Sequence, residues 1–257
     1  MNKINRVVII IFSFGFFIGC KNNIDNQDVL FQVSTINALL EGVYDGEFSF
    51  RELKTFGDLG LGTFNSLDGE MIMVDGEIYQ VKSDGKVYVI PDSAKTPFSA
   101  VTFFEEDTSI AINGLTDYKS MEEFLDNNLP TRNLIYAIKI EGLFKYARTR
   151  SVPKQEKPYP PLMEVVKTQP EFEFHNVKGT LVGFRLPEYI NGINVPEYHL
   201  HFITENKEGG GHLLELETGK VRVGIDFTDK IFVILPNSRE FYDADLCKEK
   251  DLEKVER

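Results

Sequence analysis

The sequence predicts an α+β fold made of two mixed, β-rich sheet domains with few helices. With 42% hydrophobic and 26% charged residues among its 257, the chain has the composition of a globular protein. Short runs rich in β-branched and aromatic residues are separated by turn dipeptides such as Asp75-Gly76 and Asp84-Gly85, which favour hairpins. Residues 152–161 hold four prolines and resist regular structure. They predict a boundary between an N-terminal domain at 29–160 and a C-terminal domain at 161–257.

The start of the chain is expected to lie outside the fold. Lys3 and Arg6 precede an uninterrupted run of apolar and small residues up to Gly19, which predicts a secretory signal too short for a comfortable membrane span. The run ends at Cys20, in a setting that resembles a bacterial lipoprotein signal. The resemblance implies that residues 1–19 are removed, that Cys20 carries lipid, and that 20–28 tether an extracytoplasmic protein to a membrane. Plain secretion is the alternative.

Each domain is expected to carry its own sheet. Residues 50–59 read as a short helix or turn, and 120–128 as a helix capped by Ser120 with Glu123 three residues on. The strands expected before the proline-rich run are 62–64, 70–74, 77–82, 86–90, 98–105 and 133–144. Those expected after it are 163–167, 172–175, 178–185, 220–226 and 230–235, together with a hairpin around residue 205.

Three of the four histidines fall in one short window, at His199, His201 and His212. Side chains alternate along a strand, so His199 and His201 point to the same face. Apolar flanks at 195–204 and 213–216 predict two strands, and the polar run between them, which ends in three glycines, predicts the turn. Such a hairpin brings His212 beside the other two. Three converging imidazoles are the usual protein ligands of a catalytic zinc ion, with a fourth position left open.

Two alternatives to zinc stay open at this point. Copper, iron and manganese also bind imidazole, so zinc is inferred from ligand number and softness. The histidines could instead be ordinary surface residues of a hairpin, although the third one beyond the turn favours a metal. The remaining histidine, His175, stands apart and is expected to be structural.

Charge and cysteine content exclude some classes of protein. The formal net charge of -12 argues against nucleic acid, because phosphate binding needs clustered Lys and Arg. An acidic protein also repels anionic substrates, so such a substrate would need a local positive centre. Cys20 and Cys247 are the only cysteines, and a lipid on Cys20 leaves Cys247 without a partner and predicts no disulfide.

Three separated motifs resemble those of the acetolactate decarboxylases. They are residues 62–71 (Gly-Thr-Phe-Asn-Ser-Leu-Asp-Gly-Glu-Met), residues 150–159 (Arg-Ser-Val-Pro-Lys-Gln-Glu-Lys-Pro-Tyr), and the pattern His-x-His, ten residues, His. The three motifs occur in the order found in that family, and the resemblance spans nearly the whole chain after the signal. Taken alone, Glu70 and Arg150 would be surface residues, and the resemblance is what raises them to candidates.

The resemblance implies an acetolactate-decarboxylase-like fold and zinc-dependent conversion of 2-acetolactate to acetoin and carbon dioxide. By resemblance the zinc ligands are His199, His201 and His212. The same resemblance gives Glu70, Arg150 and Glu256 as catalytic residues, with Glu253 the rival for the last position, and Thr63 and Arg150 as substrate-binding residues. The substrate is a small molecule, and contact with a membrane is expected only through the lipid on Cys20.

The chemistry has a physical logic. Loss of carbon dioxide leaves an electron pair on carbon that the adjacent ketone oxygen must accept as an enediolate, and a zinc ion can stabilise that charge as a Lewis acid. Arg150 would hold the departing carboxylate, and Glu70 or Glu256 would move protons, with Arg150 an alternative proton donor. An extracytoplasmic metal-binding lipoprotein or a zinc hydrolase remains the alternative function. A homodimer formed through exposed sheet edges of the N-terminal half is also expected.

Overall fold

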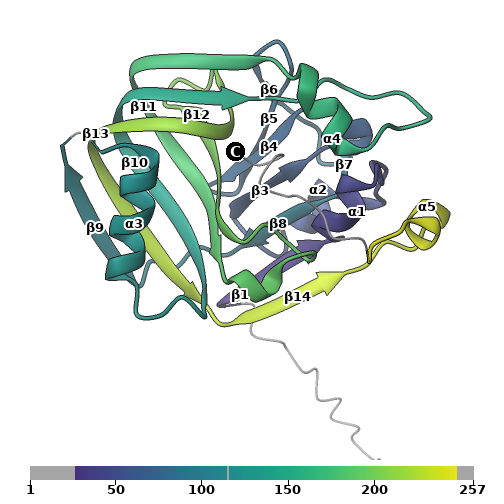
Figure 1. Cartoon of the computed structure of the whole chain (residues 1–257), viewed down its shortest axis with the longest axis horizontal. Coiled ribbons are helices and arrows are strands. Elements are labelled where there is room, and N and C mark those ends of the chain that lie inside the picture. Colours follow the sequence, from purple (N-terminus) through teal and green to yellow (C-terminus); the bar gives the residue numbers. More distant parts are fainter. Residues whose placement is uncertain (1–26, 115, 248–257) are drawn as a thin grey trace, which may run out of the picture.

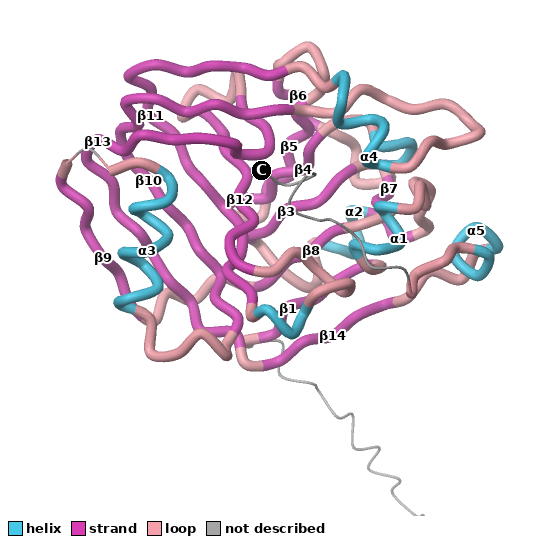
Figure 2. Tube along the Cα trace, viewed as in Figure 1, coloured by secondary structure: helices cyan, strands magenta, loops and turns pink. Residues whose placement is uncertain are grey.

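The chain folds into two large β-sheets that pack against each other, with short helices at their margins (Figures 1 and 2). The computed structural model describes residues 27–114 and 116–247, so the expected signal, Cys20 and most of the tether lie outside the described part. Leu61 and Ile72 of one sheet share an apolar cluster with Val182 and Phe184 of the other. The predicted α+β fold, with two β-rich sheets and few helices, is confirmed.

The first sheet has seven strands. Their order is β14 (Lys230–Ile234), β1 (Val29–Val33), β8 (Ser99–Thr102), β3 (Leu59–Thr63), β4 (Glu70–Val74), β5 (Glu77–Val81) and β6 (Val87–Val89). Strands β1 and β14 are parallel and all other neighbours are antiparallel, so the sheet is mixed. A small ladder of β2 (Phe48–Ser49) and β7 (Lys95–Thr96) lies apart from it.

The second sheet is antiparallel, with the order β10 (Ile135–Arg150), β11 (Glu171–Leu186), β12 (Glu197–Thr204), β13 (Gly210–Thr228) and β9 (Thr108–Asn113). Strand β10 also pairs with β13, so the four strands β10 to β13 close on themselves. The ends of β10, β12 and β13 therefore meet on one side of this sheet.

The two sheets do not follow the predicted boundary between 29–160 and 161–257. Strands β9 and β10 precede the proline-rich run yet belong to the second sheet, and β14 returns to the first. The reason is that β10 continues to Arg150 and pairs along its length with both β11 and β13. The prolines end a long strand instead of separating the sheets.

The helices are short and lie beside the sheets. They are α1 (Ile36–Leu40), α2 (Phe50–Leu53), α3 (Tyr118–Asn128), α4 (Leu162–Val165) and α5 (Arg239–Asp243), with 3-10 turns at Asn65–Leu67, Val166–Thr168 and Glu188–Ile190. Helix α3 begins earlier than predicted because Asp117, not Ser120, is its N-cap: the Asp117 carboxylate accepts a hydrogen bond from the backbone N–H of Ser120 at 2.8 Å. Among the described residues, no helix has the length and apolarity needed to cross a membrane.

The glycines before His212 allow three strands to approach closely. A Cβ atom on Gly210 would lie 2.3 Å from the carbonyl oxygen of Phe202, and one on Gly211 would lie 2.3 Å from that of Arg150. Gly211 also has a backbone φ of +135°, which residues other than glycine rarely adopt. The glycines, expected only to turn the chain, thus bring β13 against both β12 and β10 at the position of His212.

Candidate active site

Backbone pairing brings the predicted site residues together from both sheets. In the second sheet, His201 of β12 lies opposite His212 of β13, and His212 also lies opposite Arg150 of β10. In the first sheet, Thr63 of β3 lies opposite Glu70 of β4. Directly opposed residues in antiparallel strands have Cβ atoms about 5 Å apart, so register alone makes these residues neighbours.

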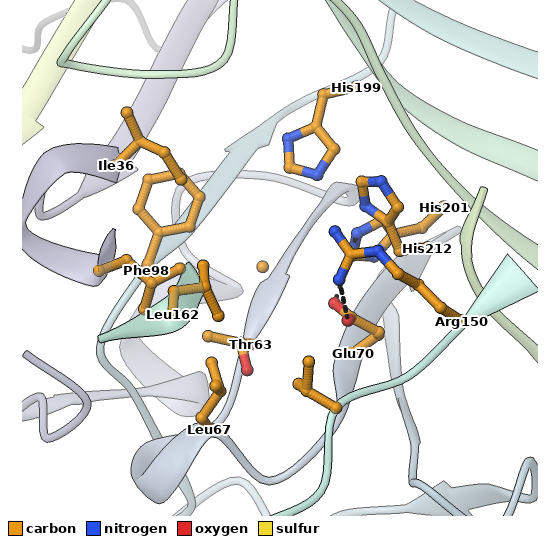
Figure 3. Close-up of a pocket in the computed structure, with 13 residues that line it drawn as sticks. Ile36, Thr63, Leu67, Glu70, Phe98, Arg150, Leu162, His199, His201 and His212 are labelled. Carbon is orange, nitrogen blue, oxygen red and sulfur yellow. Dashed lines mark ion pairs between the residues drawn. The ribbon is translucent and has the colours of Figure 1, made fainter. Parts of the chain in front are cut away.

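The three histidines converge on one point (Figure 3). Their ring centroids are 5.1 to 5.3 Å apart, and one ring nitrogen from each lies within 4.8 Å of the others. All three side chains are buried. The hairpin predicted from the sequence is present, whereas the reading of these residues as ordinary surface histidines is wrong.

A backbone carbonyl of the first sheet orients His201. Its Nδ1 lies 2.8 Å from the carbonyl oxygen of Met71, which can only accept, so Nδ1 carries the proton. The lone pair of the ring is therefore on Nε2. This nitrogen is buried and has no hydrogen-bond partner in the described part of the chain, although a carboxylate oxygen of Glu70 lies 3.6 Å away. An inward-facing lone pair on a ring held by a carbonyl is what a metal ligand requires.

Burial keeps His199 and His201 neutral. Desolvation, with a smaller effect from the positive charge of Arg150, lowers the pKa of His199 from 6.5 to about 3. Burial likewise lowers the pKa of His201 well below its ordinary value, and its neighbour His199 adds to the effect. Metal ions bind the neutral form, so no proton has to be displaced at neutral pH. The ligand set fits a divalent ion such as zinc, which three nitrogens can hold with a fourth position left for another ligand.

A buried pair of opposite charges adjoins the histidines. Arg150 and Glu70 are 4% and 7% exposed, and their Nη1 and Oε1 atoms lie 3.7 Å apart. Buried charges are costly unless paired, and here each nearly balances the other. Among the described residues the charges of the site thus nearly cancel, and a divalent ion would make this part of the site attractive to an anion.

Among the described residues, the rest of the pocket lining is apolar apart from Thr63. Its hydroxyl donates to the carbonyl oxygen of Gly69 at 2.7 Å, so toward a ligand it can only accept a hydrogen bond. The apolar lining, which the sequence analysis missed, consists of Ile36, Leu39, Leu67, Phe98, Val152 and Leu162. Figure 3 shows Ile36, Phe98 and Leu162 across the cavity from the histidines. Leu67 and Val152 lie inside the quoted motifs; the others carry no signal that separates them from core residues.

The remaining predicted residues lie either outside the described part of the chain or away from the pocket. Glu253, Glu256 and Cys20 fall outside the described residues, so their assigned roles stay predictions. His175 has a side chain 64% exposed, on β11 beside Glu173 and away from the pocket. Cys247 is exposed and forms no disulfide with any described residue.

The pocket between the two packed sheets holds three converging imidazoles and an adjoining arginine–carboxylate pair. This combination is typical of an enzyme with a metal centre. Residues 30–248 match the family model of alpha-acetolactate decarboxylase. The chain therefore belongs to the alpha-acetolactate decarboxylase family, and it is an enzyme of the carboxy-lyase class.

Individual relatives agree with this assignment over most of the chain. The alpha-acetolactate decarboxylase of Methanosarcina mazei is 53% identical over 90% of this chain and 81% of its own length. That of Bacillus subtilis strain 168 is 46% identical over 88% and 90%. The crystal structure of the Bacillus subtilis enzyme superposes with a TM-score of 0.87 at 45% identity and covers 89% of this chain and 99% of that chain.

Replacing His199 with alanine is expected to abolish zinc binding, because two imidazoles no longer complete the ligand set. Purified protein would be loaded with zinc, dialysed and analysed for metal, with about one ion per chain expected in the unaltered protein and almost none in the variant. His175→Ala is the matched control and should retain its zinc. Equal zinc content in all three proteins would rule out this centre.

Proposed function

We propose that the chain decarboxylates 2-acetolactate to acetoin and carbon dioxide, with a zinc ion at the three-histidine centre. The observation that carries the proposal is the junction of three buried imidazoles with the buried pair Arg150 and Glu70. A metal carrier has no need of the arginine or the carboxylate, and the family model supports the reaction.

The substrate carries a carboxylate, a hydroxyl and a ketone on successive carbons. When the bond to the carboxylate breaks, its electron pair stays on carbon and must pass to the ketone oxygen. A bound zinc ion would supply the Lewis acid that stabilises this negative charge. In our proposal the guanidinium of Arg150 binds the carboxylate with two parallel hydrogen bonds and orients the breaking bond.

Glu70 is the described group that could move the proton. It reaches toward both Arg150 and His201, at 3.7 and 3.6 Å, and so stands between the carboxylate site and the candidate metal centre. A carboxyl there can exchange a proton with the substrate hydroxyl or the developing carbanion. Thr63 would accept a hydrogen bond from the substrate, and the apolar wall would contact its methyl groups. Glu256, or its rival Glu253, remains a proposed second carboxyl.

The test is acetoin formation from racemic 2-acetolactate by the zinc-loaded protein, measured by a colour assay with and without chelator. Glu70→Gln should lower kcat by roughly a hundredfold or more, the usual effect of losing a general acid or base. Glu77→Gln, at the exposed start of β5, is the control and should leave kcat unchanged. If the zinc-loaded protein forms no acetoin, the proposed decarboxylation is refuted. If it hydrolyses esters instead, a hydrolase is favoured.

We also propose that the mature chain is a lipoprotein anchored at Cys20 outside the cytoplasm. The support is the apolar run before Cys20 and the polar residues after it. Expression of the full chain in a bacterial host should place it in the membrane fraction, and Cys20→Ser should release it. Identical fractionation of the two proteins would contradict the anchor and leave plain secretion.

A homodimer is the third proposal. Strand β14 ends the first sheet and, among the described strands, pairs on one side only. Its Ile231 and Phe232 are 42% and 45% exposed, and Leu235 beyond it is 57% exposed. An exposed apolar edge is commonly covered by a second copy. Sedimentation velocity at micromolar concentration should give the mass of two chains, and Phe232→Glu should shift it to one; a single-chain mass for the unaltered protein would exclude the dimer.

A further inference from the structure

We propose that Gln169 is a positioning residue for Arg150, and that its neutrality is as important as its hydrogen bond. The side-chain oxygen of Gln169 accepts a hydrogen bond from Nη1 of Arg150 at 3.0 Å. This inference rests on the proposed function, in which Arg150 binds the carboxylate of the substrate. Gln169 lies outside the motifs that identified the other site residues.

The backbone around Gln169 is fixed against the end of β10. Pro170 follows it and restricts it to an extended conformation, with ψ at 138°. The carbonyl oxygen of Pro170 accepts a hydrogen bond from the N–H of Ser151 at 3.2 Å, directly after Arg150. Ser151 is itself held by a hydrogen bond from its hydroxyl to the carbonyl oxygen of Val81 at 2.7 Å. The amide of Gln169 is therefore presented to Arg150 from a well-determined position.

The contact orients the guanidinium. Nη1 of Arg150 lies between the oxygen of Gln169 at 3.0 Å and a carboxylate oxygen of Glu70 at 3.7 Å. The second distance is too long for a hydrogen bond, so Glu70 supplies charge and Gln169 supplies direction. A guanidinium is planar and rigid, and fixing one nitrogen restricts the plane of the whole group. Two-point binding of a carboxylate depends on that plane.

A neutral acceptor does this without cancelling the charge of Arg150. Glu70 already provides one negative charge beside the guanidinium. A carboxylate at position 169 would place Arg150 between two negative charges and lower the net charge of the site by one unit, which weakens its attraction for the carboxylate of the substrate. Glutamate has nearly the shape of glutamine and keeps an acceptor oxygen, so Gln169→Glu adds a negative charge, in place of the amide NH2, without removing the acceptor. Gln169→Leu removes the acceptor and adds no charge.

The experiment compares zinc-loaded wild-type protein with Gln169→Leu, Gln169→Glu and Thr168→Val. The last is the control, because Thr168 is exposed and its hydroxyl lies 3.4 Å from the carbonyl oxygen of Val165 in its own turn. We would measure kcat and KM for 2-acetolactate and the inhibition constants of two probes, 2-hydroxy-2-methylpropanoate, which carries a carboxylate, and acetoin, which does not. Thermal unfolding and zinc content verify the fold of each variant.

Both Gln169 variants should raise KM and weaken binding of the carboxylate probe by about tenfold. In Gln169→Leu the cause is the loss of a hydrogen bond to a charged group, and in Gln169→Glu it is the added negative charge beside Arg150. Acetoin inhibition should change by less than about twofold, because acetoin has no group for Arg150 to bind. In Gln169→Glu, kcat should fall less than KM rises. Thr168→Val should match the wild type.

The proposal would be overturned if KM were unchanged in both variants. It would also be overturned if the inhibition constants of acetoin and of the carboxylate probe rose by the same factor. A wild-type protein that forms no acetoin would instead overturn the proposed function. In that event, the binding of 2-hydroxy-2-methylpropanoate to the zinc-loaded proteins, measured by calorimetry, still tests the role of Gln169. We expect weaker binding to Gln169→Glu than to wild type. Equal binding would refute the role of Gln169.

Discussion

The pairing of β12 with β13 is the constraint on which the site depends. It places His201 opposite His212, and a shift by one residue would turn His201 and His199 to the other face of the sheet. Gly210 and Gly211 permit the close approach that this register needs. Since His201 is also held by the carbonyl oxygen of Met71, the packing of the two sheets sets the direction of its lone pair.

A second constraint is charge. The chain is strongly acidic, with a formal net charge of -12, yet the substrate that we propose is an anion. Among the described residues of the pocket, Arg150 and Glu70 nearly balance in charge, and burial keeps His199 and His201 neutral. A divalent ion bound there would therefore determine the sign of the field that the substrate meets. In this arrangement Gln169 is useful because it directs Arg150 and adds no negative charge.

The sequence predicted local features better than distant pairings. The histidine hairpin was predictable because strand alternation and turn residues are local signals. The boundary between the two sheets was not predictable from the sequence. The strand that became β10 was expected to end at residue 144, whereas bulges let it continue to Arg150 and pair with β13. The N-cap at Asp117 was missed because Ser120 offered a similar signal three residues on. Ile36 and Leu162 could not be recognised as pocket residues, because lining residues and core residues have the same composition.

The most direct measurement is the anomalous X-ray diffraction of crystals of the zinc-loaded protein at the zinc absorption edge. We expect one strong peak among the three histidines, about 2.0–2.1 Å from a ring nitrogen of each, with Nε2 as the ligand atom of His201. Absence of a peak there, with the three rings turned away from one another or the zinc bound elsewhere, would contradict the account.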